Sequence, residues 1–329
     1  MQKKQRNNLL ISLCLLFGLG IFSLTTAYAQ TNATITLEPE HPGPYEKVTL
    51  TLSSYSFDVD LASINWFVNG KTALAGPGER SFTITTGGVG ESSLVKARVL
   101  LVNGEEVEVD TLLSPQGISL IWEAPESYTP PFYEGRSLPA EGSSVHLVAE
   151  PTISFQGRRV PPEDLAYSWY SNGELITSAS GRGKRSATIP LEYLSNSTKI
   201  RVVARDTNGN TAAKEITIYP AEIRPTFYLR DPTLGVDYTK NLGGRFETTG
   251  EFTLAFVPYF FSTNNGLGSS VRYAWALDGL PIEPGTNTAL TFRPQESAAG
   301  LRTLTVNVNN SKRKLQKAVG KLTILFDTR

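Results

Sequence analysis

A five-residue motif occurs three times in this 329-residue chain and constrains its fold more than any other feature. The copies are Trp66-Phe67-Val68-Asn69-Gly70, Trp169-Tyr170-Ser171-Asn172-Gly173 and Trp275-Ala276-Leu277-Asp278-Gly279. The tryptophans are 103 and 106 residues apart, a typical domain length. Asn-Gly and Asp-Gly favour a two-residue hairpin turn, because both central residues of that turn need a positive φ. Each tryptophan is therefore predicted to lie on a strand that turns back immediately.

Further strands are predicted at similar distances from each tryptophan, because stretches with alternating apolar and polar residues recur there. Short stretches follow at Ser81–Ile84, Ser186–Ile189 and Ala289–Phe292, and longer ones at Val95–Val99, Ile200–Ala204 and Leu304–Val308. Turns are then predicted at Asn103-Gly104, at Asn208-Gly209 and in the polar stretch Asn309–Lys312. A final strand follows each turn, and two strands precede each tryptophan.

This arrangement predicts an all-β chain with three tandem immunoglobulin-like β-sandwich modules and no long helix. About seven short strands per unit, with a tryptophan on the third, are typical of that sandwich. Trp66, Trp169 and Trp275 are predicted core residues that pack against aliphatic side chains. The modules are predicted at 30–115, 116–221 and 222–329, with boundaries near Pro115 and Ala221. The short, proline-containing linkers predict a semi-extended rod.

Residues 1–29 have the pattern of a secretory signal peptide. Basic residues near the N-terminus precede the apolar stretch Leu9–Leu24, and Ala27-Tyr28-Ala29 supplies the small-x-small cleavage pattern. Two interpretations remain open: cleavage before Gln30, or retention of the segment as an N-terminal membrane anchor. Both predict an exported protein, located outside the cell, at the cell surface or in the periplasm.

Cleavage would also remove the only cysteine, Cys14, and the only methionine, Met1. The mature chain then has no disulfide, no thiolate nucleophile and no cysteine-based zinc site. Without the three basic residues of the leader, 28 basic and 31 acidic side chains leave a net charge of −3. Nucleic acid is therefore not an expected partner, and a membrane is one only if the leader is retained.

No cofactor, metal site or catalytic residue is predicted. His41 has no evident catalytic partner, and His146 alternates with apolar residues on a predicted strand. Glu105 and Glu106 are neighbours on one strand, so their side chains point to opposite faces. The loop 206–210 alternates oxygen-bearing residues, but its glycine lies where a hairpin turn needs it and not where an EF-hand needs it. A hairpin is the preferred interpretation of this loop, and calcium binding is the alternative.

Two aromatic groups are weak binding candidates. Tyr128, Phe132 and Tyr133 lie on a proline-containing stretch of the second module, and Tyr259, Phe260 and Phe261 are consecutive in the third. Such side chains either recognise a partner, by docking a protein or stacking on a sugar, or pack against the first unit or their own sandwich. Three consecutive aromatics cannot all face one core. At least one of the second group should therefore be exposed or buried in a loop contact.

Basic residues cluster in three predicted turns, at Arg158-Arg159, at Arg182-Gly183-Lys184-Arg185 and at Lys312-Arg313-Lys314 with Lys317. The chain is not basic overall, and no aromatic residues are interleaved with these clusters. They are interpreted as solvated hairpin tips, and contact with an anionic envelope polymer is the alternative.

The repeated tryptophan motif, the Asp206–Asn210 hairpin and the module length resemble tandem bacterial immunoglobulin-like or PKD-like repeats of surface proteins. The chain is also similar to uncharacterised exported proteins of ultra-small candidate-phylum bacteria. The resemblance implies spacers, adhesive units or binding platforms. We therefore expect a non-enzymatic structural or adhesive protein that binds an envelope or surface protein, for example by adding an edge strand. Glycan recognition through the loop aromatics is the alternative, and an undetected enzyme or enzyme-accessory subunit is a third hypothesis.

Overall fold

The structure, a computed structural model, describes residues 33–263, 271–282, 288–294, 299–313 and 315–327. The predicted signal peptide at 1–29 lies outside the described residues. Within them the chain is all-β, and the single helical element is a 3-10 turn at Pro162–Asp164. None of the described helical residues form a segment long and apolar enough to cross a membrane.

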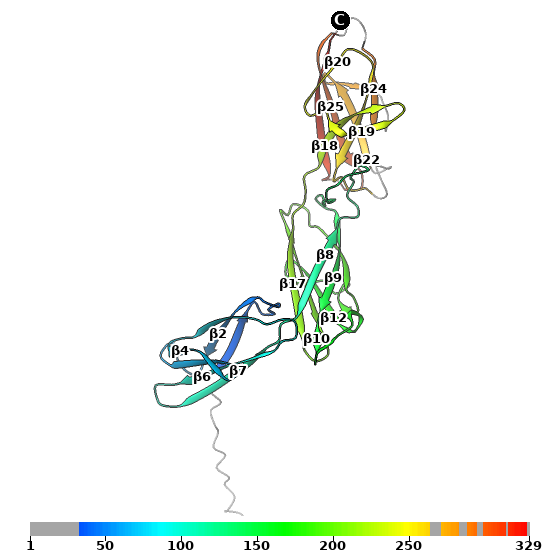
Figure 1. Cartoon of the computed structure of the whole chain (residues 1–329). Coiled ribbons are helices and arrows are strands. Elements are labelled where there is room, and N and C mark those ends of the chain that lie inside the picture. The colour runs from blue at the N-terminus through cyan, green and yellow to red at the C-terminus, as the bar shows by residue number, and fades with distance from the viewer. Residues whose placement is uncertain (1–32, 264–270, 283–287, 295–298, 314, 328–329) are drawn as a thin grey trace, which may run out of the picture. The chain divides into compact units, whose positions relative to one another are not determined.

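The first sandwich consists of two sheets that share no strand (Figure 1). One sheet has the order β1 (Ala33–Glu38), β2 (Lys47–Ser54), β5 (Ser81–Thr85). The other has the order β4 (Lys71–Pro77), β3 (Ser63–Val68), β6 (Ser93–Leu100), β7 (Glu106–Leu113). Alternate residues of β2, β3 and β6 are buried and form the core between the sheets.

The second sandwich repeats this arrangement. Its smaller sheet has the order β15 (Ser186–Pro190), β9 (Ser144–Thr152), β8 (Gly117–Glu123). Its larger sheet has the order β13 (Glu174–Leu175), β12 (Ala166–Ser171), β16 (Thr198–Arg205), β17 (Thr211–Ile218), and β14 (Gly181–Arg182) also pairs with β12. A separate hairpin of β10 (Ser154–Phe155) and β11 (Arg158–Arg159) lies in the connection from β9 to β12.

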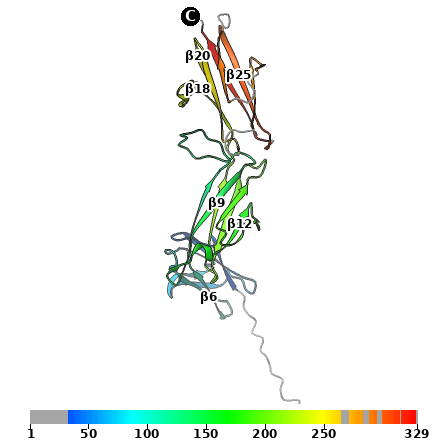
Figure 2. The ribbon, with the colours of Figure 1, turned by 90° about the vertical axis from the view of Figure 1, so that its right-hand side faces the viewer.

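The third sandwich has additional strands at its edges. One sheet has the order β19 (Gly235–Asn241), β18 (Arg224–Asp231), β21 (Phe252–Tyr259), β24 (Ala289–Phe292). The other has the order β20 (Arg245–Thr248), β26 (Lys317–Phe326), β25 (Gly300–Asn310), β22 (Val271–Leu277), β23 (Leu280–Ile282). β20 pairs with β26 in parallel. Figure 2 separates β18 from β25, which belong to opposite sheets.

The strands predicted from alternation are confirmed in all three sandwiches, and so are the turns after the tryptophans. The Asx residue and the glycine of each motif have positive φ, with 49° and 79° at Asn69 and Gly70, and similar values in the other two copies. Sequence reasoning did not predict the β10–β11 hairpin or strands β14, β19 and β20. These are short or edge elements, in which the apolar alternation is weak.

The three tryptophans are buried core residues, as predicted, with at most 2% of each side chain exposed. The expectation of purely aliphatic neighbours is wrong for two of them. The ring of Trp66 stacks on Phe82 with a centroid distance of 5.7 Å, and Trp275 lies 6.1 Å from Phe256. Without an inter-sheet disulfide, aromatic rings fill part of the space between these sheets.

By backbone contacts the chain divides into two compact units. One contains the described residues up to Thr36 together with Thr51–Phe82 and Lys96–Thr111, and the other contains Leu37–Leu50, Thr83–Val95 and the chain from Leu112 onward. This division does not coincide with the predicted boundaries near Pro115 and Ala221, which fall between strands and stay predictions. The second and third sandwiches therefore belong to a single compact unit.

Candidate functional site

The predicted aromatic residues meet at segment 124–143, which connects β8 to β9 and is the blue-green loop beside the third sandwich in Figure 2. Tyr133 lies 5.6 Å from Tyr259 and 6.2 Å from Phe260, measured between ring centroids. The backbone N–H of Tyr128 donates to the carbonyl of Phe261 at 2.9 Å, and that of Phe260 donates to the carbonyl of Tyr128 at 2.8 Å. The two groups, more than 120 residues apart in sequence, therefore pack against each other.

This contact corrects the expected packing partner of the Tyr128–Tyr133 stretch. The sequence suggested packing against the first unit or the stretch's own sandwich, but the stretch pairs with the third sandwich through a short antiparallel β-bridge between Ser127 and Ser262. Both bridge residues lie just beyond a strand of their own sandwich. Pairing of two extended ends satisfies backbone groups that would otherwise need water.

The six aromatic candidates differ in how accessible they are. Phe261 is fully buried in the third core, and Phe260 is buried in the loop contact with a φ of 66°. The expectation that one of the consecutive aromatics lies in a loop contact is therefore confirmed. Tyr128 and Tyr259 are half-buried, whereas Phe132 is 94% exposed and Tyr133 37% exposed. Only the last two present much ring surface to a ligand.

Burial also affects the tyrosine hydroxyls at this contact. It raises the pKa of Tyr128 to about 12. Burial, followed by a hydrogen bond with Tyr228 at 2.6 Å, raises the pKa of Tyr259 as well. Both side chains are uncharged near neutral pH, so they act as packing groups in this contact.

A polar network surrounds this aromatic contact. The Arg313 guanidinium reaches the Glu126 carboxylate at 2.5 Å and also donates to the carbonyl of Gly142. The Gln316 side-chain amide donates to the carbonyl of Glu141 at 2.8 Å and to the Ser262 hydroxyl at 2.7 Å. Both donors come from the connection between β25 and β26. We call the contact of segment 124–143 with residues 260–263, 310–313 and 315–316 the joint.

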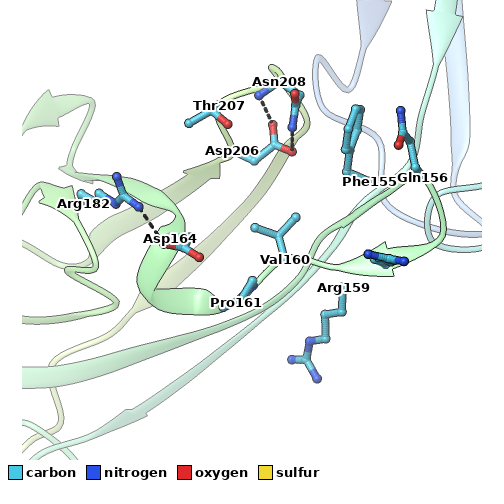
Figure 3. A pocket seen from close by; sticks show the side chains of 11 residues that line it. Phe155, Gln156, Arg159, Val160, Pro161, Asp164, Arg182, Asp206, Thr207 and Asn208 are labelled. Carbon is cyan, nitrogen blue, oxygen red and sulfur yellow. Dashed lines mark hydrogen bonds and ion pairs between the residues drawn. The ribbon is translucent and has the colours of Figure 1, made fainter.

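A second feature lies elsewhere in the second sandwich, where three connections meet (Figure 3). They are the connection from β9 to β12, the connection that ends in β14, and the loop between β16 and β17. Together they line an open hollow of about 770 Å³, which we call the arginine hollow. Its lining residues are Phe155, Gln156, Arg158, Arg159, Val160, Pro161, Asp164, Arg182, Asp206, Thr207 and Asn208.

Both acidic groups of the arginine hollow already have partners. Asp164 forms an ion pair with Arg182 at 2.7 Å. Burial raises the pKa of Asp206, but side-chain hydrogen bonds from Asn210 and Asn208 outweigh that effect and lower the pKa below its ordinary value. Asp206 is therefore ionised at neutral pH, and its carboxylate accepts the hydrogen bonds that hold the β16–β17 turn; the two from Asn208 are drawn in Figure 3. The hairpin interpretation of this loop is confirmed.

The basic groups of the hollow are less fully paired. Among the described residues, no ion pair or hydrogen bond engages the side chain of Arg158, and Arg159 donates to the carbonyl of Pro151 at 3.1 Å. Two of the basic clusters that the sequence shows as separate turns thus contribute to one hollow. Sequence reasoning missed this convergence. Which connections lie side by side depends on how the strands pair within the sandwich, and that pairing cannot be read from the local sequence.

His41 lies 3.9 Å from Glu40, and Nδ1 of His146 lies 3.1 Å from the Thr188 hydroxyl. In the part of the chain that the structure describes, no three histidine, cysteine, aspartate or glutamate residues are grouped so that they could hold a metal ion.

No protein-family model and no curated protein matches the chain. Among solved structures, it is similar to the central fibronectin-III array of RIM-binding protein, with 12% identity, a TM-score of 0.30, and coverage of 90% of this chain and 96% of that one. It is also similar to the fibronectin(III)-like modules of Clostridium thermocellum CbhA, with 13% identity, a TM-score of 0.26, and coverage of 57% and 94%. A 1.5-MDa bacterial ice-binding adhesin matches with 10% identity, a TM-score of 0.23, and coverage of 90% and 99%. These scores are low, so the fold assignment rests on the sheets themselves.

Proposed function

We propose that this chain is a non-enzymatic exported protein of the cell surface or envelope, which acts as a structural or adhesive rod and binds another protein. The joint is the observation that carries this proposal. Relative motion is the default between sandwiches connected by short linkers. Here a 20-residue segment, 124–143, supplies backbone pairing, aromatic packing and an ion pair to the next sandwich. Such a joint suits a protein that must hold its binding surfaces at a fixed spacing.

The proposed way of binding is addition of a strand from the partner to an open sheet edge. β17 is an eight-residue edge strand, and no described strand hydrogen-bonds to its outer side, although β8 of the other sheet lies close to part of it. An edge of this length presents backbone N–H and C=O groups to an incoming strand. The edge strand β7 of the first sandwich is a poorer candidate, because its charged residues Glu106, Glu108 and Asp110 are all acidic, whereas β17 carries one basic and one acidic residue, Lys214 and Glu215. Charged side chains on an edge discourage pairing.

Co-sedimentation with envelopes of the source organism tests the proposal. Residues 30–329 include every described residue and would be incubated with untreated and with protease-stripped envelopes. Binding that is lost on stripping supports a protein partner. Binding that survives stripping would contradict it and would favour a glycan, and failure to bind either preparation would contradict an adhesive role.

Carbohydrate binding through the loop aromatics is the second candidate function, and the exposure of Phe132 favours it. This ring is 94% exposed on a proline-containing loop, beside the partly exposed Tyr133. The test replaces Phe132 by Ala and measures binding to stripped envelopes. A loss of binding supports this site, provided that the matched variant Leu194→Ala binds normally. Leu194 is another largely exposed apolar residue of the same sandwich, at 85%. Equal binding of both variants would remove Phe132 from the site.

A further inference from the structure

The arginine hollow has the chemistry of a ligand site that is independent of the joint. Cavities of roughly 300–1,000 Å³ are typical of small-ligand sites, and the hollow has about 770 Å³. Its walls come from three connections held by one sandwich, so the scaffold places residues from 155 to 208 around one space. Connections supported in this way commonly carry binding residues.

The charge of the hollow favours an anion. Arg182 and Asp164 neutralise each other, and the Asp206 carboxylate is occupied by the amides of its own turn. No carboxylate neutralises Arg158 or Arg159, but Arg159 donates to the carbonyl of Pro151, so among the described residues that line the hollow the Arg158 guanidinium is the one left for a ligand. A guanidinium binds a carboxylate through two parallel hydrogen bonds. The lining side chains include three guanidinium groups and two carboxylates, a net charge of +1, which suits a singly charged ligand unit better than a polyphosphate.

The remaining walls combine an apolar surface with amides. Phe155 is 40% exposed, and Val160 and Pro161 continue this surface. Figure 3 shows Phe155 and Gln156 on one side of the hollow, Arg182 with Asp164 on another, and the loop that carries Asn208 on a third. An aromatic ring offers a flat surface for the apolar face of a sugar, and amide groups can bind its hydroxyls.

We propose that the arginine hollow binds an acidic sugar unit of a glycan chain. Arg158 holds the carboxylate, the ring of Phe155 covers one face of the sugar, and the amides of Gln156 and Asn208 meet its hydroxyls. This inference goes beyond the proposed protein-binding role and uses none of the residues of the joint. It also gives a function to the basic clusters at Arg158-Arg159 and Arg182–Arg185, which were interpreted from the sequence as solvated hairpin tips.

Calorimetric titration of residues 30–329 with tetragalacturonate tests the proposal, and the fully methyl-esterified tetrasaccharide is the matched neutral probe. Because the ester removes the charge-assisted hydrogen bonds, we expect it to bind at least about tenfold more weakly. The affinity for the acid should fall when NaCl is raised from about 50 to about 500 mM. No binding of the acid, or equal binding of acid and ester, would overturn the proposal. Tighter binding of tripolyphosphate than of tetragalacturonate would overturn the sugar assignment.

Three variants locate the site. Arg158→Gln should weaken binding of tetragalacturonate about tenfold or more, and Phe155→Ala should weaken it about fivefold. Arg185→Gln is the matched control, because Arg185 belongs to the same basic cluster as Arg182 but pairs with Glu150 and does not line the hollow. It should change the affinity less than about twofold. Equal losses in Arg158→Gln and Arg185→Gln would show non-specific attraction and would overturn the assignment.

Thermal melting of all three variants keeps this test interpretable. Arg158 and Phe155 are both exposed, so the wild-type melting temperature should be retained. A binding loss in a variant that melts normally then reports on the hollow and not on folding. Phe132→Ala should leave this affinity unchanged, and this outcome separates the hollow from the aromatic loop.

Discussion

The guanidinium of Arg313 lies 2.5 Å from the carboxylate of Glu126, which precedes it by 187 residues in the chain. Both side chains are about three-quarters buried. A pair buried to this extent differs from a surface ion pair, because loss of one partner leaves the other charge with little water and no counter-ion. The pair therefore makes the docking of segment 124–143 on the third sandwich specific.

We expect Glu126→Gln to loosen the joint. The substitution leaves the Arg313 charge without its partner, and it should cost about 1–3 kcal/mol of local stability. Hydrogen exchange followed by mass spectrometry should show faster exchange in 124–143. The control is Glu251→Gln, which removes the exposed partner of Arg293, also 2.5 Å away, and should cost less than about 0.5 kcal/mol. Unchanged exchange at 124–143 in Glu126→Gln would mean that the pair does not hold the segment.

Trp169→Phe tests the hydrogen bond of the core indole. Nε1 of Trp169 donates to the carbonyl of Lys184 at 3.0 Å, and Trp66 makes the same bond with Glu79 at 2.7 Å. The substitution leaves a carbonyl without its donor and opens a small cavity, so it should cost about 2–3 kcal/mol. Hydrogen exchange of the backbone amides in β12 and β16, compared between the wild type and the variant, would measure this loss of stability. Trp122→Phe, at a half-buried position under the guanidinium of Arg136, should have less than half the effect.

Gly173→Ala tests the turn that follows the tryptophan. Gly173 has a φ of 87°, and an added Cβ would meet no atom within 4 Å. Only backbone strain then opposes the substitution, at a cost of about 1 kcal/mol. Gly244→Ala is the control, because it has the same free space but no positive φ, and it should be close to neutral. Equal urea midpoints for the two variants would contradict the strain argument.

The pH dependence of stability should include a contribution from Asp206. The pKa of this carboxyl is lowered in the folded state, so its contribution is complete above the ordinary aspartate pKa and is lost as pH falls through the lowered value. Asp206→Asn should therefore destabilise the protein by about 1–2 kcal/mol at neutral pH. The difference should shrink at about pH 3 or below. A difference in urea midpoint that stays constant between these pH values would contradict the assignment.

Removing the hydroxyl group should change the stability of the protein in opposite directions at two tyrosines of the third sandwich. The Tyr273 hydroxyl is buried without a hydrogen-bond partner among the described residues, and burial raises its pKa. Tyr273→Phe should therefore be neutral or stabilising by up to about 1 kcal/mol. Tyr228→Phe removes the 2.6 Å hydrogen bond to Tyr259 and should destabilise by about 1 kcal/mol. Thermal melting of the two variants measures the difference, and a clear loss of stability in Tyr273→Phe would contradict it.

The sequence alone was sufficient to predict the repeated core of this protein. The tryptophan, the Asx-Gly turn three residues later and the alternating strands are local signals, because side-chain alternation and the need for positive φ act over a few residues. They predicted the buried positions of Trp66, Trp169 and Trp275 and most strand positions. They also marked Arg158-Arg159 and Arg182–Arg185 as turns or hairpin tips, but the structure places Arg158 and Arg159 on the short strand β11 and Arg182 on β14, each next to a turn.

Tertiary structure alone decided which of these local elements meet. Phe260 and Phe261 looked like candidates for exposed contacts, but the β-bridge between Ser127 and Ser262 brings segment 124–143 over the third sandwich, and both rings are buried. Arg158 and Arg182 line one hollow because the strands that carry them end on the same side of the second sandwich. Such contacts join residues tens to hundreds of positions apart. These long-range contacts are determined by strand pairing and by the packing of whole sheets. Neither of these is encoded by a short-range pattern in the sequence.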